Sequence, residues 1–297
     1  MKTSTRNAYA QRIDRVVERL QQAVAQGGEV PDLAELATVA HLSPFHFHRV
    51  WRALTGESVG GTVARLRLLR ALHLLADPQA VVGEVASAAG YATAQAFARA
   101  FRDATGASPS ELRGQSERIL ATIARLEKPP RDEVATQAAL QVEVVSVEPF
   151  EVVALRNRGA FADLDQAYGR LFVWAAEAGL VECIIGLHGV PLADHRDVPP
   201  ADLEFDCSIR LSAIADPPSP LRLARLGGGD YARLRHVGSF LALEGLVDRV
   251  LAEWLPISGY ALRDAPIHYN YHDDPEVVPE ALLRTDIFVP VAGEAQS

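Results

Sequence analysis

The chain of 297 residues is long enough for two domains of ordinary size, and 48% hydrophobic with 23% charged residues are typical of a globular protein. No apolar run approaches the eighteen residues that a membrane-spanning helix needs, and the first residues lack the apolar stretch of a signal peptide. Cys183 and Cys207 are too few for a disulfide framework. We therefore expect reduced thiols, a cytoplasmic location and no membrane partner.

The charge is distributed unevenly along the chain. Residues 1–131 carry 17 basic and 12 acidic residues, whereas residues 132–297 carry 12 basic and 26 acidic residues. The net charges of the two parts are therefore +5 and −14, which together give the −9 of the whole chain. A basic first part and an acidic second part indicate two functions on one chain.

The first part opens with a helical pattern over 9–25 and then contains one element twice. The stretches FHFHRVWRALTGES (45–58) and QAFARAFRDATGAS (95–108) align when they are shifted by fifty residues. In each stretch apolar residues recur at i, i+3, i+4 and i+7, which predicts one buried helical face. These residues are Phe47, Val50, Trp51 and Leu54 in the first copy and Phe97, Ala100, Phe101 and Ala104 in the second.

Each repeated helix is predicted to begin at a capping residue and to end at a glycine. The caps and stops are Ser43 and Gly56 in the first copy, and Thr93 and Gly106 in the second. A shorter helix and a tight turn precede each copy, over 33–40 and 82–89, and a long helix over 59–76 connects the copies. This layout is that of a tandem helix-turn-helix, although a plain helical bundle with a duplication has the same spacing.

The positions that do not face the core carry polar and cationic side chains. We expect these side chains to point outward: Phe45, His46, His48, Arg49 and Arg52 in the first copy, and Gln95, Ala96, Ala98, Arg99 and Arg102 in the second. Arginine can bond guanine as a fork, glutamine can do the same with adenine, and an apolar side chain can touch the thymine methyl. A connecting helix of about 27 Å can hold two such helices about one DNA turn apart. The pattern therefore predicts sequence-specific binding of double-stranded DNA.

Residues 8–113 resemble the DNA-binding domain of the AraC/XylS family of bacterial transcription regulators. The resemblance rests on LSPFHFHRVWRALTGES and on AGYATAQAFARAFRDATGASPSELR, with its closing Gly-x-Ser-Pro-x-x-x-Arg. It implies that the second helix of each unit lies in the major groove. The residues that would read bases are Phe45, His48 and Arg49 in the first helix and Gln95, Ala96 and Arg99 in the second, while Arg52 and Arg102 look like phosphate contacts.

A spacer over 114–140 follows this domain. It contains an amphipathic helical piece with Ile119, Ile123 and Leu126, which ends at Pro129-Pro130 and continues into a charged, alanine-rich segment. Such a change of composition is typical of a linker.

From residue 141 the pattern changes to strands, and a second internal repeat appears at a shift of 79. Leu155, Arg156, Gly159, Leu164 and Arg170 align with Leu234, Arg235, Gly238, Leu243 and Arg249. Each copy reads β-β-α-β-β, over about 141–212 and 220–291, and the second copy opens with a predicted hairpin whose turn is Gly227–Gly229. We therefore expect two domains: an all-α tandem helix-turn-helix of about seven helices, then an α+β domain over 141–291. In that domain the two units would form an antiparallel sheet with a central groove.

Residues 141–291 resemble the GyrI-like family of effector-binding modules, through GGGDYARLRHVGSF, AEWLPISGY and DDPEVVPEALLRTDIFVPV. The resemblance implies an aromatic cavity with an acidic side chain that binds amphipathic, often cationic, small molecules; some relatives hydrolyse small ligands. The candidate ligand-binding residues are Tyr168, Trp174, Asp206, Trp254, His268, Tyr269 and Tyr271. Family members often place a glutamate shortly before the Asp-Pro turn of the second half. Here that stretch reads PIHYNYHDDPE, and Asp206 or Asp286 could substitute.

Together these features predict a bacterial one-component transcriptional regulator that is nucleoid-associated when bound to DNA, senses a small-molecule effector and has RNA polymerase as a further partner. Two alternatives stay open. The second domain could hydrolyse its ligand, with Glu177, Glu253, His268 and Tyr269 as candidate groups, or it could bind another protein through its acidic surface. We expect no enzyme activity, catalytic residue, metal or cofactor.

Overall fold

The structure is a computed structural model that describes residues 3–27, 29–127, 139–160, 163–192, 194, 196, 198–213 and 216–293. The chain divides into two compact units. Residues 8–136 form one, here called the N-terminal unit; residues 137–297 together with residues 1–7 form the other, here called the C-terminal unit. Residues 128–138 of the predicted linker (114–140) lie outside the described residues. No helix within the described ranges has the length and apolar character needed to cross a membrane.

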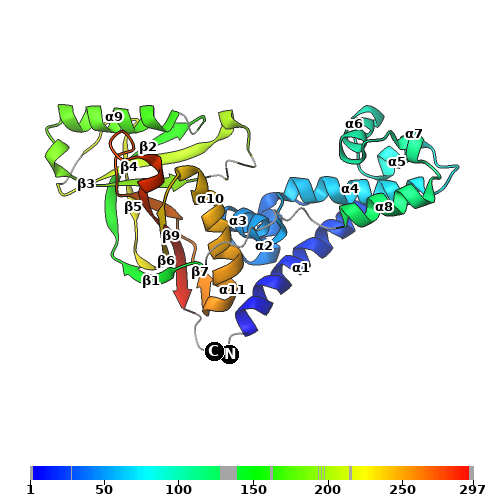
Figure 1. Cartoon of the computed structure of the whole chain (residues 1–297), viewed down its shortest axis with the longest axis horizontal. Coiled ribbons are helices and arrows are strands. Elements are labelled where there is room, and N and C mark those ends of the chain that lie inside the picture. The colour runs from blue at the N-terminus through cyan, green and yellow to red at the C-terminus, as the bar shows by residue number, and fades with distance from the viewer. Residues whose placement is uncertain are drawn as a thin grey trace. The chain divides into compact units, whose positions relative to one another are not determined.

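Eight helices make up the described part of the N-terminal region (Figure 1). They are α1 (Thr3–Gln26), α2 (Leu33–Ala40), α3 (Pro44–Thr55), α4 (Val59–Leu75), α5 (Val82–Ala88), α6 (Ala94–Thr105), α7 (Pro109–Leu112) and α8 (Ser116–Leu126). Helices α2 and α3 form one helix-turn-helix, α5 and α6 form the other, and α4 connects them. The predicted tandem architecture is confirmed.

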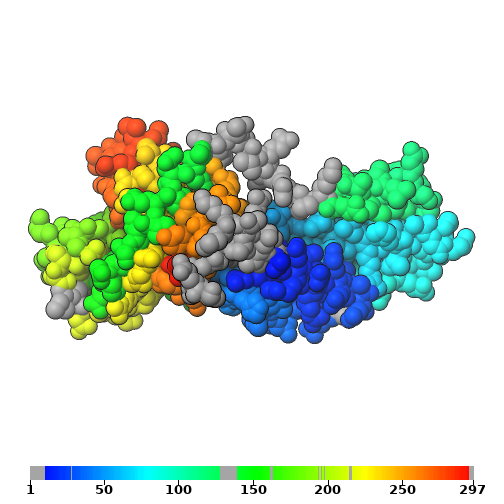
Figure 2. Space-filling view, turned by 90° about the horizontal axis from the view of Figure 1, so that it is seen from below, coloured from blue at the N-terminus to red at the C-terminus, as the bar shows by residue number. Residues whose placement is uncertain are grey.

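The helical spacing correctly predicted which large side chains are buried. Phe47 and Trp51 of α3, and Phe97 and Phe101 of α6, are fully buried. Helices α4 to α8 share one core, to which α8 contributes Ile119 and Ile123. Figure 2 shows the green residues of α6 to α8 lying against the light-blue and cyan residues of α4 and α5. The helical part of the predicted linker is thus packed onto the second helix-turn-helix.

Local chemistry defines the ends of α3 and α6. Gly56 and Gly106 end them in the left-handed region, with φ of 78° and 74°, where a glycine avoids the clash of a Cβ. Thr93 caps α6 by accepting a hydrogen bond from the Ala96 amide at 3.1 Å. Ser43 occupies the equivalent position before α3 but makes no capping hydrogen bond through its side chain.

The C-terminal unit is an antiparallel sheet of nine described strands with helices against it (Figure 1). The strands are β1 (Val142–Val147), β2 (Phe150–Arg158), β3 (Ile184–Pro191), β4 (Glu204–Leu211), β5 (Arg222–Leu226), β6 (Gly229–Val237), β7 (Tyr260–Leu262), β8 (His268–Tyr271) and β9 (Arg284–Gly293). Their order is β1-β6-β9-β8-β3-β4-β2-β5, and β7 pairs with β9. The helices are α9 (Leu164–Glu177), α10 (Leu243–Arg249) and α11 (Leu255–Ser258), the last two joined by a π-helical turn, η5 (Val250–Trp254).

The two sequence repeats exchange their first strands. Strand β1 pairs with β6 of the second repeat, and β5 pairs with β2 of the first. The predicted hairpin at Gly227–Gly229 is therefore wrong, because β5 and β6 pair with other strands and not with each other. Residues 148–149 alone join β1 to β2, and residues 227–228 join β5 to β6. At this crossing a Cβ on Gly227 would lie 2.5 Å from the carbonyl oxygen of Glu148, so the close approach requires glycine.

This exchange forces the sheet to curl. Strand β1 lies at one edge and β2 lies next to the opposite edge, yet two residues connect them. The sheet therefore has a helix face, covered by α9 and α10, and an inner face enclosed by the curl. In β4 both faces are buried from Phe205 to Ile209. Asp206 and Ser208, which alternate with Phe205, Cys207 and Ile209 along the strand, are buried because the curl covers their side as well.

Candidate functional sites

The outer face of α6 is open to solvent. Gln95, Ala96, Arg99 and Arg102 are all exposed, as predicted. Arg99 has 89% of its side chain exposed, and its Nε lies 4.0 Å from a carboxylate oxygen of Asp103, one turn further along. Since the other outward residues are alanines, only Gln95, Arg99 and Arg102 can form polar contacts with a partner on this face.

The outer face of α3 differs from that of α6. Phe45, His48 and Arg52 are partly buried, and Arg49 keeps only 1% of its surface exposed, so the prediction that Arg49 points into solvent is wrong. Helical side chains lean toward the N-terminus of their helix. The guanidinium carbon of Arg49 accordingly lies 5.2 Å from the centre of the Phe45 ring, one turn earlier. The residue equivalent to Phe45 in α6 is Gln95, which offers Arg99 no ring.

His46 was also expected to point outward and is buried instead. Its ring packs edge-on against Phe45, with 5.2 Å between the ring centres. Phe45 therefore contacts two buried side chains, His46 and Arg49, that were predicted to point into solvent.

On the helix face of the C-terminal unit, aromatic side chains gather beneath α9 and α10. They are Tyr168, Phe205, Phe240, Tyr269 and Tyr271. The ring centres of Tyr168 and Tyr271 are 6.2 Å apart, and those of Phe240 and Tyr271 are 5.1 Å apart. Three of the seven candidate ligand residues, the tyrosines, thus lie in one place, here called the tyrosine site.

Glu244 of α10 brings a carboxylate to the tyrosine site. It is 4% exposed and accepts a hydrogen bond from the hydroxyl of Tyr269 at 3.2 Å. Sequence reasoning missed Glu244, because a single glutamate in an amphipathic helix usually faces solvent. The available signal was its spacing: Glu244, Val247 and Leu251 stand at i, i+3 and i+7, so the glutamate interrupts an apolar stripe.

Strand β3 passes beneath these rings at Gly189. A Cβ there would lie 2.5 Å from the ring of Phe205 and 2.7 Å from the hydroxyl of Tyr271, so only glycine leaves room for both. Burial raises the pKa of Tyr168 and of Tyr271 well above the usual range for a phenol. Both hydroxyls therefore stay protonated, and that of Tyr168 donates to the His188 carbonyl at 2.8 Å.

The other candidate ligand residues lie elsewhere. Asp206 and His268 are on the inner face, where Asp206 accepts hydrogen bonds from Arg156 and Arg222. Its repeat counterpart Asp286 is held in the same way by Arg235 and His272. Because arginines already balance both carboxylates, neither substitutes for the missing glutamate at the tyrosine site.

The two tryptophans among the candidate ligand residues, Trp174 and Trp254, are also separate from the tyrosine site. Trp254 stacks on Tyr260 at 6.1 Å between ring centres, where η5 leads into α11 and β7. Trp174 is partly buried on α9. Among the described residues neither tryptophan makes a ring contact with the three tyrosines.

The centre of the inner face carries a pair of buried histidines. His188 on β3 and His268 on β8 stand eighty residues apart, at matching places in the two repeats, and their ring centres are 6.3 Å apart. Tyr231 and Phe288 pack on His268, at 5.0 and 4.7 Å. Burial lowers the pKa of His188 to about 4 and that of His268 to about 3, so both rings are neutral at physiological pH.

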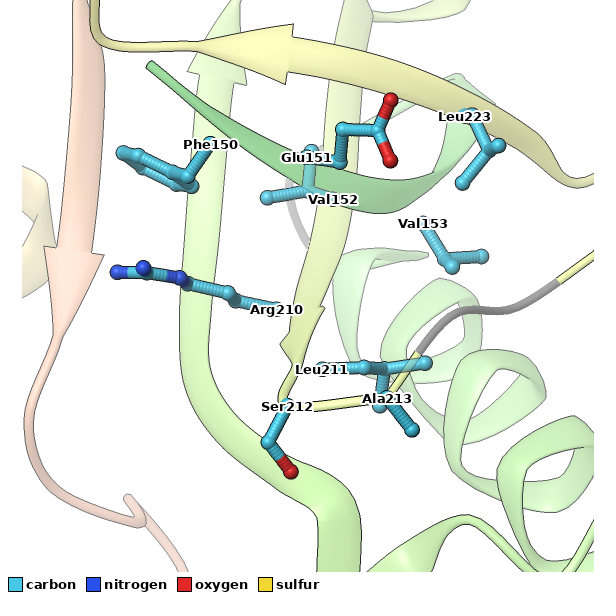
Figure 3. A pocket seen from close by; sticks show the side chains of 9 residues that line it. All are labelled: Phe150, Glu151, Val152, Val153, Arg210, Leu211, Ser212, Ala213 and Leu223. Atoms are coloured by element: carbon cyan, nitrogen blue, oxygen red, sulfur yellow. The ribbon is translucent and has the colours of Figure 1, made fainter. Parts of the chain in front are cut away.

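A pocket of about 260 Å³ lies where β2 and β4 separate, beyond the last paired residues Val153 and Ile209. Figure 3 shows the guanidinium of Arg210 beside the ring of Phe150, 4.4 Å from its centre. None of the candidate ligand residues lines this pocket.

Comparison with known proteins identifies both units. The GyrI-like small molecule binding domain family matches residues 140–292, and a helix-turn-helix domain family matches residues 36–115. The probable transcriptional regulator YgiV of Escherichia coli (strain K12) is 31% identical over 159 residues, which are 53% of this chain and 99% of that protein. The Msm operon regulatory protein of Streptococcus mutans serotype c is 24% identical over 110 residues, 37% of either chain. A solved hydrolase from Listeria innocua covers 53% of this chain and 94% of its own at 14% identity, and its TM-score of 0.38 is too low to carry a functional inference.

An AraC-type helix-turn-helix domain followed by a small-molecule-binding domain defines a transcriptional regulator. The chain belongs to the GyrI-like family, whose domain forms its C-terminal unit.

Proposed function

We propose that the chain binds promoter DNA through α3 and α6, and that an amphipathic, cationic small molecule bound at the tyrosine site changes this binding. The observation that carries the DNA part is the division of α6 into two faces. Phe97 and Phe101 anchor one face in the core, while Gln95, Arg99 and Arg102 stand in solvent on the other. Such a regulator acts in the cytoplasm, on the nucleoid, with RNA polymerase as its further partner.

The two reading helices contribute differently in this proposal. On α6, Arg99 bonds a guanine, Gln95 bonds an adenine, Ala96 meets a thymine methyl and Arg102 contacts a phosphate. On α3, Arg52 lies at the position equivalent to Arg102, and His48 lies at the position equivalent to Ala98. Arg49, the equivalent of Arg99, has to leave the ring of Phe45 before it can reach a base.

Replacing Arg99 with alanine should weaken specific DNA binding by about 1–3 kcal/mol, or about 5- to 150-fold, since one bidentate base contact is lost. The measurement is fluorescence anisotropy with an operator selected from random duplexes by the wild-type chain. Arg118→Ala on α8 is the matched control, because Arg118 is exposed and bonds Gln115 of its own turn. Equal affinities for the wild type and Arg99→Ala would contradict the assignment of α6 as a reading helix.

The tyrosine site favours a cationic ligand with apolar groups. Aromatic faces attract cations, and a carboxylate in a desolvated site adds to this attraction. The site offers the rings of Tyr168, Tyr269 and Tyr271 with the buried carboxylate of Glu244. In this proposal Glu244 of α10 supplies the carboxylate that family members often place shortly before the Asp-Pro turn.

Replacing Glu244 with glutamine should weaken binding of a hydrophobic quaternary ammonium probe, benzyltributylammonium, by at least about tenfold, or about 1.4 kcal/mol. Glutamine keeps the shape and removes the charge. Isothermal titration calorimetry measures the affinity, and Glu253→Gln is the control, since Glu253 is exposed and pairs with Arg249. The proposal fails for this site if Glu244→Gln binds the probe as tightly as the wild type does.

A further inference from the structure

Helix α8 lies beyond the matched helix-turn-helix, residues 36–115, and directly before the segment that leads to the C-terminal unit. Ile119 and Ile123 of α8 are buried in the core that also holds Phe97 and Phe101 of α6. A displacement of α8 therefore acts directly on the packing beneath the second reading helix.

The last turn of α8 holds the end of α6. The Nη2 of Arg125 donates to the carbonyl oxygen of Ala104 at 2.9 Å. Ala104 lies in the last turn of α6, where carbonyl groups have no partner within the helix and where a cation is favourable. This contact ties the C-terminal end of the second reading helix to α8.

A second contact leads from α8 to the first reading helix. Arg65 on α4 donates its Nη1 to the carbonyl oxygen of Leu126, the last residue of α8, at 3.1 Å. The same guanidinium donates its Nε and Nη2 to one carboxylate oxygen of Glu57, at 3.0 and 2.8 Å. Glu57 is buried and follows Gly56, the residue that ends α3. One arginine thus joins the end of α8 to the end of α3.

We propose that the last turn of α8 is the coupling element of this regulator, and that Arg65 and Arg125 are positioning residues that hold the two reading helices relative to it. Each reading helix is held at its C-terminal end, which leaves its outer face available for DNA. A change in the chain that follows Leu126 then acts on both helices through the two arginines. The positioning roles of Arg65 and Arg125 rest on the DNA-binding part of the proposed function, and the coupling role rests on both parts.

The first test uses Arg125→Gln in the full chain, on the operator selected by the wild type. We expect a loss of affinity of about three- to tenfold, because α6 is no longer held in place. Hydroxyl-radical footprinting should show reduced protection at the half-site that is also weakened by Arg99→Ala, with the other half-site unchanged. Arg118→Gln on the same helix is the control, and thermal midpoints verify that all variants are folded.

A double-mutant cycle separates positioning from general destabilisation. Arg125→Gln combined with Arg99→Ala should bind no more weakly than Arg99→Ala alone, because both act through α6. Combined with Arg52→Ala on α3, its effect should multiply. Equal loss of protection at both half-sites, or a multiplied effect with Arg99→Ala, would overturn the assignment of Arg125.

The conservative change Arg65→Lys tests the first reading helix. Lysine keeps a positive charge beside Glu57 but lacks the fork needed to reach Leu126 as well. We expect reduced protection at the other half-site, and unchanged protection there would remove Arg65 from the proposal.

Coupling is tested with saturating benzyltributylammonium. In the Arg65→Lys/Arg125→Gln double variant, the operator affinity should be the same with and without the probe. The coupling role would be overturned if the probe changed the operator affinity of this variant as much as it changes that of the wild type. A wild-type chain that selects no DNA contradicts the DNA part of the proposed function, and one that does not bind the probe contradicts the effector part. In the second case the half-site results still decide the positioning roles.

Discussion

The free energy of unfolding of the C-terminal unit should decrease by up to about 5 kcal/mol as the pH falls from about 6.5 to about 4.5, because His188 and His268 are buried in their neutral form. Burial lowers the pKa of His188 to about 4 and that of His268 to about 3, from an ordinary value of 6.5. In this pH window the unfolded chain binds a proton at each histidine and the folded chain does not. Each pH unit therefore removes up to about 1.36 kcal/mol per histidine, whereas above about 6.5 both states are neutral and the effect vanishes.

Urea unfolding followed through tryptophan fluorescence measures this dependence, with Trp174 and Trp254 reporting on the C-terminal unit and Trp51 on the N-terminal unit. The double variant His188→Phe/His268→Phe keeps ring packing on the inner face and cannot titrate, so its stability should vary much less over the same window. The window ends near pH 4.5 because most unperturbed carboxyl groups remain ionised there. A double variant with the same pH dependence as the wild type would show that other groups are responsible.

Replacing Arg196 with alanine should destabilise the C-terminal unit by up to about 3 kcal/mol, because the fully buried carboxylate of Asp194 loses its arginine while Arg196 itself is partly exposed. Arg196 bonds Asp194 through Nε and Nη2, at 2.8 and 2.5 Å, and Asp248 of α10 through Nη1 at 2.7 Å. Asp194 is buried, and burial raises the pKa of Asp248 by more than its bond to Arg196 lowers it. Burial would by itself lower the pKa of Arg196, but its bonds to the two carboxylates raise it, so the guanidinium stays charged.

The measurement is the free energy of unfolding from urea titration at neutral pH. Arg158→Ala is the control, because Arg158 forms an exposed pair with Glu204 and should cost at most about 1 kcal/mol. If Arg196→Ala were no more costly than the control, the segment after β3 would not be anchored to α10 through these charges.

The sequence predicted the features that depend on local spacing. The buried faces of α3 and α6, and the glycines that end both helices, follow from contacts within a few residues. Strand pairing in the second domain does not follow in this way. Since the two repeats are similar, the alternating side chains of β1 fit pairing with β2 as well as pairing with β6. Only the curl of the whole sheet decides which of the two strands β1 pairs with.

The sites show the same limit. Helical spacing placed Arg49 and Arg99 on equivalent faces, but it could not show that Phe45 offers Arg49 an aromatic surface where Gln95 offers Arg99 none. The tyrosines were found because the resemblance to the GyrI-like family implies an aromatic cavity. Glu244 was not, since its burial depends on α10 lying across the sheet.

The exchange of β1 and β5 has a consequence for the origin of the domain. A single repeat, 141–212 or 220–291, cannot complete its own sheet, since one of the two strands that pair with its second strand belongs to the other copy. A free-standing ancestor of one repeat would have needed a second molecule to donate that strand, as in a domain-swapped homodimer. Gene fusion of such a dimer would produce this chain, in which each half supplies one strand to the other.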